Sequence, residues 1–283
     1  NNTGVGHASL ESNTTGTGNV AVGQGSLAAN TTANYNTAIG YASMDVTTTG
    51  NNNVAVGTSS LGANTTGHSN AAIGLSAMVA NTTGVENVAV GKSALDSNTT
   101  GASNSALGMS SGTGITTGTG NTTIGHDCLS NLTTGGNNVG LGRGSVASAV
   151  DVSNEITFGN SSIAALRCQD QSIAALSDAR DKTDVVDLPH GLDFINQTRP
   201  VRFKWDKREY LSDDTKQGTT NYGFIAQELL AIGDNEEHRL VYESNPEKLE
   251  ARYSNLIPIL TKAIQELSTK NDALEARITA LEA

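Results

Sequence analysis

The sequence has few of the residues that build a conventional globular core and few features that crosslink or anchor a chain. Its 283 residues include four Phe, one Trp and four Pro against 31 Gly, which argues against one ordinary hydrophobic core along the whole length. The two cysteines, Cys128 and Cys168, cannot make a disulfide framework, and we expect two reduced thiols. A long apolar run and a signal peptide are both absent, so we expect no membrane insertion.

Charge is also scarce, but only in one part of the chain. Residues 1–176 contain eight acidic and three basic residues, whereas residues 177–283 contain 20 acidic and 14 basic ones. Glycine shows the reverse distribution, with 27 residues before position 177 and four after it. This change in composition predicts a domain boundary at the junction. The net charge of −11 disfavours nucleic acid or an anionic membrane as the main partner.

Residues 1–160 repeat one 17-residue unit, which is typical of a stacked repeat architecture. Glycine marks the period at Gly6, Gly23, Gly40, Gly57, Gly74, Gly91, Gly108, Gly125, Gly142 and Gly159. Four residues earlier stands Asn, at Asn2, Asn19, Asn36, Asn53, Asn70, Asn87, Asn104, Asn121 and Asn138, with Glu155 in the last unit. Residue 1 falls inside a unit, so we expect the chain to be part of a longer protein.

Two apolar rows follow the same period. The residue just before each glycine is of a core type: Val5, Val22, Ile39, Val56, Ile73, Val90, Leu107, Ile124, Leu141 and Phe158. Four residues after it come Leu10, Leu27, Met44, Leu61, Met78, Leu95, Leu129, Val146 and Ile163, with Gly112 as the exception. We expect both rows to be interior.

The repeat favours β structure over helix. Asn-Val-Ala-Val-Gly predicts a short strand whose side chains alternate between two faces, and Asn-Thr-Thr-Gly predicts a turn in which Gly takes a positive φ. Ten coils about 4.8 Å apart would span roughly 45 Å. A thin coil buries too little apolar surface to be stable alone. We therefore predict a subunit interface at the row of small residues, Ala21, Ala38, Ala55, Ala72, Ala89 and Ala106.

The pattern Asn-x-Val-Ala-Val/Ile-Gly resembles the head repeats of trimeric bacterial adhesins. That resemblance implies a parallel β-roll, although the unit is longer here. We read the Asn-Thr-Thr sequons as turns rather than glycosylation sites; they begin at Asn13, Asn30, Asn64, Asn81, Asn98 and Asn121. His7, His68 and His126 do not all share one repeat phase, so they cannot form a metal ladder, and we expect neither a metal nor a cofactor. Exposed Asn, Thr and Tyr rows, including Tyr35 and Tyr41, allow binding of a host-surface carbohydrate or receptor.

Residues 161–176 form a predicted neck. Ser162-Ile163-Ala164-Ala165-Leu166 recurs ten residues later as Ser172-Ile173-Ala174-Ala175-Leu176. Such apolar segments suit packing about a symmetry axis.

The junction follows at Ser177-Asp178-Ala179-Arg180-Asp181-Lys182. The hydroxyl of Ser177 is adjacent to the carbonyl of Leu176, so attack on that carbonyl would need no substrate binding. A serine requires a base, and Lys182 is a candidate. Because five residues of regular helix or strand do not place two side chains on one face, the pair requires a turn, or else a lysine from a neighbouring chain. Spacing alone would fit an ordinary exposed loop.

This segment is similar to the start of the S74 peptidase family, the C-terminal intramolecular chaperones of phage tailspikes and tail fibres. The similarity continues through Arg199-Pro200-Val201-Arg202-Phe203-Lys204-Trp205, then Tyr222-Gly223-Phe224-Ile225-Ala226-Gln227-Glu228 and Arg252-Tyr253-Ser254-Asn255-Leu256. The resemblance implies a trimeric chaperone released by cleavage between Leu176 and Ser177. It implies Ser177 as nucleophile and Lys182 as base, with Asp178 and Arg180 in a catalytic or a structural supporting role.

Residues 183–255 predict a mixed α and β domain. We expect a helix over 190–197 with Leu192 and Ile195 inward, a strand over 201–205, a loop over 207–221, a helix over 224–232 ending at Gly233, and a short strand over 240–242. His190 and His238 are read as surface or capping residues rather than ligands.

The C-terminal residues, about 256–283, show a heptad repeat typical of a parallel coiled coil. Positions a are Ile257, Ile264, Asn271 and Ile278, and positions d are Leu260, Leu267, Leu274 and Leu281. Pairs from g to e, Lys270 with Glu275 and Arg277 with Glu282, suit identical parallel helices. Ile at a with Leu at d favours two strands, whereas the family resemblance implies three, and we expect a trimer.

The sequence therefore predicts a trimeric parallel β-solenoid (1–160), a neck (161–176) and an α+β chaperone with a coiled coil (177–283). We expect the distal part of a homotrimeric phage tail fibre or tailspike, in the virion after assembly in the host cytoplasm, that cuts itself between Leu176 and Ser177. The alternative is a non-enzymatic trimeric adhesin or structural fibre whose coiled coil stays uncut. Whether cleavage acts within or between chains is open.

Overall fold

The computed structural model describes residues 1–163, 166–167, 177–204, 218, 220–233, 238–243 and 249–282. It divides into two compact units, Asn1–Ile163 and Ala164–Ala283. Most of the predicted neck lies outside the described residues, as do Leu176, Cys168 and Trp205.

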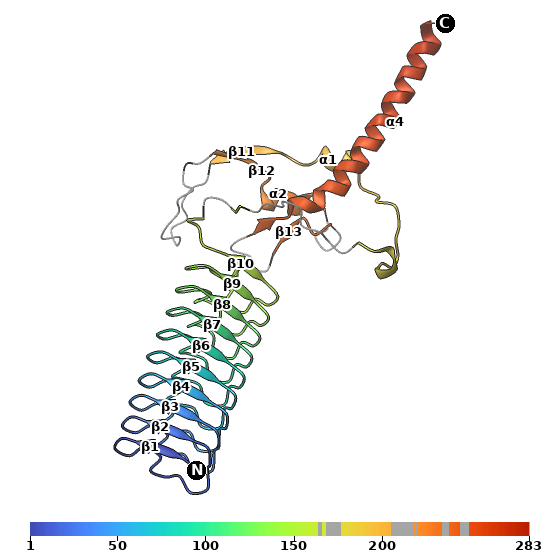
Figure 1. Ribbon diagram of the computed structural model, residues 1–283. Coiled ribbons are helices and arrows are strands. Elements are labelled where there is room, and N and C mark those ends of the chain that lie inside the picture. The colour runs from blue at the N-terminus through green and yellow to red at the C-terminus, as the bar shows by residue number, and fades with distance from the viewer. Residues whose placement is uncertain are drawn as a thin grey trace. The chain divides into compact units, whose positions relative to one another are not determined.

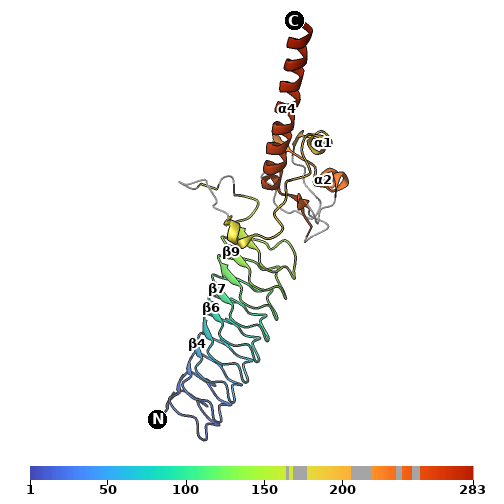
Figure 2. The ribbon, with the colours of Figure 1, turned by 90° about the vertical axis from the view of Figure 1, so that its right-hand side faces the viewer.

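The first unit is a parallel β-solenoid with one short strand in each coil (Figures 1 and 2). Its ten strands pair in sequence order, and equivalent residues 17 positions apart face each other, as in Ala38 opposite Ala55. The repeat-based prediction of the fold class is thereby confirmed. The strands are β1 (Thr3–Val5), β2 (Val20–Val22), β3 (Thr37–Ile39), β4 (Val54–Val56), β5 (Ala71–Ile73), β6 (Val88–Val90), β7 (Ser105–Leu107), β8 (Thr122–Ile124), β9 (Val139–Leu141) and β10 (Ile156–Phe158).

The two faces of each strand are reversed relative to the sequence prediction. The middle alanine of β2 to β7 is buried inside its own coil, at 0–2% exposure, so it cannot form a subunit interface. The residue before each glycine points outward instead; Ile39, Leu107 and Phe158 are 39%, 52% and 59% exposed. The reason is space. Most of the Leu and Met row is buried as predicted, fills the narrow interior and leaves room opposite only for a methyl group; the buried members are Leu27, Met44, Leu61, Met78, Leu95 and Leu129. The ends of the row differ from the prediction, since Leu10 is half-buried and Val146 and Ile163 are 52% and 50% exposed.

Buried asparagines hold successive coils together. The backbone N–H of Asn70 donates to Oδ1 of Asn53 (3.0 Å), and Nδ2 of Asn53 donates to the Gly67 carbonyl (2.9 Å). The same pattern recurs at every coil from Asn19 to Asn121. These amides satisfy backbone groups that a three-residue strand leaves unpaired.

The Asn-Thr-Thr-Gly segments make a second ladder. Nδ2 of Asn64 donates to the Gly67 carbonyl three residues on (3.1 Å), and Oγ1 of Thr65 donates to the carbonyl of Thr82 in the next coil (3.1 Å). Four sequon asparagines in such turns, Asn30, Asn64, Asn81 and Asn98, are fully buried, which argues against glycosylation. Asn121 is also buried, but its sequon runs into β8 (Thr122–Ile124) instead of the predicted turn.

The turn glycine itself differs from the prediction. Gly67 does not adopt a positive φ. Instead, a Cβ there would lie 2.3 Å from Oδ1 of Asn64, so the turn requires glycine for close approach. Positive φ occurs at the glycine after the strand, such as Gly57 at 134°.

The second unit is a small α/β region with a long C-terminal helix. β11 (Val201–Lys204) pairs antiparallel with β12 (Thr220–Gly223), and β13 (Val241–Tyr242) with β14 (Glu250–Ala251). The helical segments are η1 (Ala179–Asp181), α1 (Leu192–Ile195), α2 (Ala226–Ile232), η2 (Tyr253–Asn255) and α4 (Leu256–Glu282). Their core is built by Phe194, Leu229, Leu240, Val241, Leu256 and Ile259.

Several predicted elements of this unit are confirmed with shifted bounds. The helix predicted over 190–197 is only four residues long, and Phe194 is its buried residue, while Leu192 and Ile195 are half-buried. The predicted loop over 207–221 gives way to β12 at Thr220; residues 207–217 and 219 lie outside the described residues.

Helix α4 has two apolar faces. Leu256, Ile259 and Ala263 are buried against its own unit, and the carboxylate of Glu266 accepts a hydrogen bond from the backbone N–H of Leu192 at the start of α1 (2.8 Å). Figure 2 shows α1 and α2 beside the N-terminal half of α4. The predicted heptad positions form the other face and are exposed: Ile257, Leu260, Ile264, Leu267, Leu274, Ile278 and Leu281.

The asparagine ladder predicts a large cost for losing one amide. Asn53→Ala should lower the free energy of unfolding by about 2 kcal/mol, because it leaves the buried Asn70 N–H without its acceptor and removes one of the two donors to the Gly67 carbonyl. Urea denaturation followed by circular dichroism measures this change. Thr66→Ala, at an exposed position in the same coil, is the control and should change stability by less than about 0.5 kcal/mol. Equal effects of both variants would contradict a structural role for the ladder.

Candidate functional site

A 3₁₀ turn brings Ser177 and Lys182 together. Nζ of Lys182 lies 2.7 Å from Oγ of Ser177, in hydrogen-bonding contact. The turn is η1, closed by the backbone N–H of Lys182 donating to the Ala179 carbonyl. The five-residue spacing required a turn, and the structure contains one within a single chain.

Asp178 and Arg180 build that turn. The side chain of Asp178 accepts from the backbone N–H of Arg180 (2.9 Å), and the guanidinium donates to both carboxylate oxygens (3.0 and 2.5 Å). A bidentate pair of this kind fixes orientation as well as charge. It also occupies both side chains with each other, so their charges largely cancel near Lys182.

The Asp178–Arg180 pair shifts both pKa values. The side-chain hydrogen bond from Arg180, followed by the one from its backbone, holds the pKa of Asp178 below its usual value. A lowered carboxyl pKa means that the pairing is complete above the ordinary value of about 3.9 and is lost only as the pH falls through the lowered value. The turn is therefore constant near neutral pH, and a pH dependence of chemistry there reports a group other than Asp178.

The pair is exposed in the single chain. Ser177 and Lys182 are both exposed. The carbonyl that Ser177 would attack belongs to Leu176, which lies outside the described residues. In this contact the lysine amine donates to the serine hydroxyl. The same contact would serve proton transfer from serine to lysine once the amine is neutral.

The three downstream motifs meet in one place. β11, from the Arg199 motif, pairs with β12, which ends at Gly223. Tyr253, from the last motif, packs its ring on Phe224 (centroids 5.9 Å apart), and its hydroxyl lies where a Cβ on Gly223 would be only 2.4 Å away. Sequence spacing could not reveal these contacts, because about 30 residues separate Tyr253 from Gly223.

An ion pair joins the same motifs. The guanidinium of Arg199 donates to both carboxylate oxygens of Glu228, at the start of α2, with Nε at 3.0 Å from Oε2. The hydrogen bond from Arg199 lowers the pKa of Glu228, and the carboxylate raises the pKa of Arg199. Both groups are at the surface, where such a pair adds little stability but fixes the β11–α2 geometry.

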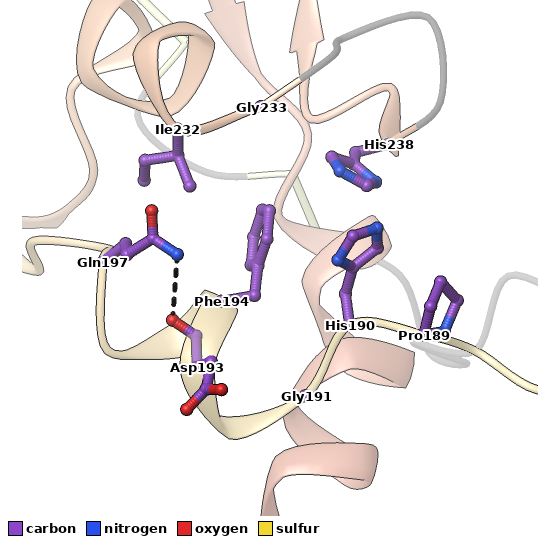
Figure 3. A pocket seen from close by; sticks show the side chains of 9 residues that line it. All are labelled: Pro189, His190, Gly191, Asp193, Phe194, Gln197, Ile232, Gly233 and His238. Carbon is purple, nitrogen blue, oxygen red and sulfur yellow. Dashed lines mark hydrogen bonds between the residues drawn. The ribbon is translucent and has the colours of Figure 1, made fainter.

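A pocket of about 300 Å³ lies between α1 and the end of α2 (Figure 3). The ring of His190 meets that of His238 edge-on, with centroids 4.4 Å apart, and Phe194 lies 5.0 Å from His238. Gln197 donates across one side to the Asp193 carbonyl (3.1 Å). The two histidines are half-buried, and both rings pack against Phe194.

The described residues contain no cluster of three or more His, Cys, Asp or Glu side chains that could hold a metal ion. None of the described helices is long and apolar enough to cross a membrane.

These features define a parallel β-solenoid followed by a small α/β region that begins with a serine–lysine pair. Residues 177–238 match the family model described as Chaperone of endosialidase, Peptidase_S74. The match begins at Ser177 itself. No curated protein and no solved structure matches the chain. A Peptidase_S74 region behind a β-solenoid fits the phage tail fibre or tailspike type of protein.

The contact at Gly223 yields a test of the motif assembly. Gly223→Ala should lower the free energy of unfolding of the C-terminal unit by about 2 kcal/mol, because the new methyl collides with the Tyr253 hydroxyl. Tyr253→Phe removes that hydroxyl, so the double variant should recover about half of the loss. Thermal unfolding of all three variants checks this. A double variant whose loss equals the sum of the single losses would contradict the contact.

Proposed function

We propose that the chain is the distal part of a homotrimeric phage tail fibre or tailspike whose C-terminal chaperone releases itself by cleavage between Leu176 and Ser177. One observation carries this proposal: the amine of Lys182 touches the hydroxyl of Ser177 at the first residues of the Peptidase_S74 match. A virion location follows from the same proposal.

The reaction is a self-cleavage with Ser177 as nucleophile. The neutral amine of Lys182 takes the hydroxyl proton while Oγ attacks the carbonyl carbon of Leu176. The Leu176–Ser177 C–N bond then breaks, and the Ser177 nitrogen takes the proton from Lys182. This leaves Leu176 joined to Oγ as an ester. Water hydrolyses the ester to a Leu176 carboxylate and a free Ser177 residue, so each chain reacts once.

Lys182 needs a drier environment than the single chain provides. Desolvation favours the neutral amine, whereas both residues of the pair are exposed here. We propose that neighbouring copies cover the pair in the trimer, so that cleavage waits for assembly. The serine and lysine in contact belong to one chain, which supports cleavage within a chain rather than between chains.

Helix α4 supports the trimer. Its heptad face is exposed while a separate face binds its own unit, so the helix can join other copies without unpacking. A trimer would set the register of the solenoids, because identical 17-residue coils could otherwise pair one coil out of step at little energetic cost. Once the chaperone has been removed, an unfolded fibre could not refold in register, so the folded trimer would be stabilised kinetically.

The alternative is a trimeric surface adhesin or structural fibre that keeps its coiled coil. The adhesin-like repeat and the exposed position of the serine–lysine pair favour it. In either case the fibre would bind a host-surface receptor or carbohydrate, for which the exposed Tyr35 and Tyr41 (67% and 57%) are candidate contacts.

Expression of the native chain tests the cleavage. The native chain should give two fragments, the smaller with Ser177 as its first residue, as measured by denaturing gel and intact mass. Ser177→Ala and Lys182→Met should each give one full-length band, whereas Thr183→Ala, next to the pair but not in it, should be cut. Full-length product from the native chain would favour the uncut fibre.

Disruption of the helix face tests the trimer and its link to cleavage. Ile264→Asp with Leu267→Asp should abolish the trimer in native mass spectrometry and slow cleavage at least about tenfold, because buried like charges prevent association. Gln265→Asp with Thr269→Asp adds the same charge at exposed positions of α4 outside the a and d rows and should leave both unchanged. Normal cleavage by a monomeric variant would refute the link.

A further inference from the structure

The outward face of the solenoid sheet is apolar along most of its length. In β2 to β9 the middle residue is buried and its two neighbours are half-buried or exposed. The exposed side chains include Val54, Ile73, Val88, Leu107 and Ile124, at 39–52%. An apolar strip of this extent on a soluble chain marks an interaction surface.

Two opposite charges flank this strip at one level only. Glu86 lies two residues before β6 and Lys92 two residues after it, and both are exposed. Across all ten strands, Glu86 is the only charged side chain two residues before a strand. At the positions two residues after a strand, the only lysine or arginine side chains are Lys92 and Arg143. The coil of β6 is thus the single coil with an acid on one edge and a base on the other.

Glu86 and Lys92 of one chain do not pair with each other. Six residues of nearly extended backbone separate them by up to about 20 Å, across the full width of the strand. The Glu86 carboxylate accepts a long hydrogen bond from the hydroxyl of Ser103 in the next coil (3.4 Å). The neighbouring coils carry His68 but no Lys or Arg at this edge, so a lysine or arginine that meets Glu86 there has to come from another molecule.

A rotation axis parallel to the stack supplies that base. Such an axis keeps every coil at its level and places the leading edge of one sheet beside the trailing edge of the next. Glu86 of one copy then faces Lys92 of its neighbour, three times in a trimer. A slip of one coil would place Lys92 beside Ser69 or Ser103, and Glu86 beside Leu75 or Met109.

We infer that the outward sheet face is where copies of this chain meet, and that Glu86 and Lys92 pair between neighbouring copies to mark the in-register arrangement. This inference rests on the proposed homotrimer and deepens it. The register would then be set in part by the solenoid itself, since a slipped assembly loses every such pair and buries charge against apolar side chains.

Charge exchange in the full chain tests the pair. Glu86→Lys and Lys92→Glu should each lower the thermal midpoint of the trimer by about 3 °C or more, because each makes like charges face each other. The double exchange, Glu86→Lys with Lys92→Glu, should restore most of the loss. A double variant that loses the sum of both single shifts would overturn the pairing.

A shifted variant of equal composition is the matched control. Glu86→Ser with Ser103→Glu moves the acid up by one coil without altering the net charge. It should be less stable than the native trimer, because its acid faces Met109 in register. Equal stability would overturn the register role.

Carbodiimide coupling of the native protein gives a direct readout, since it joins only carboxylates and amines already in contact. We expect a Glu86–Lys92 amide in covalent multimers, absent from Lys92→Met. If the native mass corresponds to three chains but neither the crosslink nor an effect of charge exchange is seen, the Glu86–Lys92 inference is overturned while the proposed trimer stands. A monomer would instead overturn the proposed trimer.

Discussion

The narrow cross-section of the 17-residue coil is the constraint on which the molecule depends. One large side chain, a pair of buried asparagines and an alanine fill the interior of a regular coil, as Leu61, Asn53, Asn64 and Ala55 do in the coil of β4. The remaining branched apolar residues therefore have to lie outside, on the sheet face. Hydrogen bonds join the coils along the axis of the solenoid, whereas the apolar side chains on its outward sheet face stay exposed in the single chain. Those two properties together favour a fibre made of several parallel copies.

The same constraint explains why such a fibre needs help in assembly. Ladder contacts between coils are nearly identical along the stack, so they give little preference for one alignment of neighbouring chains. The C-terminal unit has what the solenoid lacks, a non-repeating fold with a second apolar helix face. A cut at Ser177 would separate the two once alignment is achieved.

Much of this could be predicted from the sequence, and the failures have physical causes. The period predicted the solenoid, and the Leu and Met row predicted its core, because both are properties of the repeat. Strand alternation could not say which face lies inward, since it fixes only that neighbours point opposite ways. The prediction places Ile39 inside the coil and Ala38 outside it, and the structure shows the opposite. The space that Met44 leaves inside the coil decides this, and that space cannot be read from the sequence. β12 was missed because Thr-Asn-Tyr-Gly has no apolar alternation.

The serine–lysine site likewise has features that the sequence predicts and features that it does not. Ser177 and Lys182 were identified by motif, and the need for a turn followed from their spacing. The Asp178–Arg180 fork that builds the turn was not foreseen, although an acid at a helix start two residues before an arginine is a visible signal. The contacts of Gly223 with Tyr253 and of Glu266 with Leu192 join residues 30 and 74 positions apart, and no local pattern carries them.

We propose that the solenoid reaches its trimeric state only with the C-terminal unit attached. The most direct measurement is the native mass of residues 1–176 prepared in two ways, expressed alone and released from the full chain. We expect a trimer from the released fragment, and monomers or mixed aggregates from the fragment made alone. The same stable trimer from both preparations would contradict it.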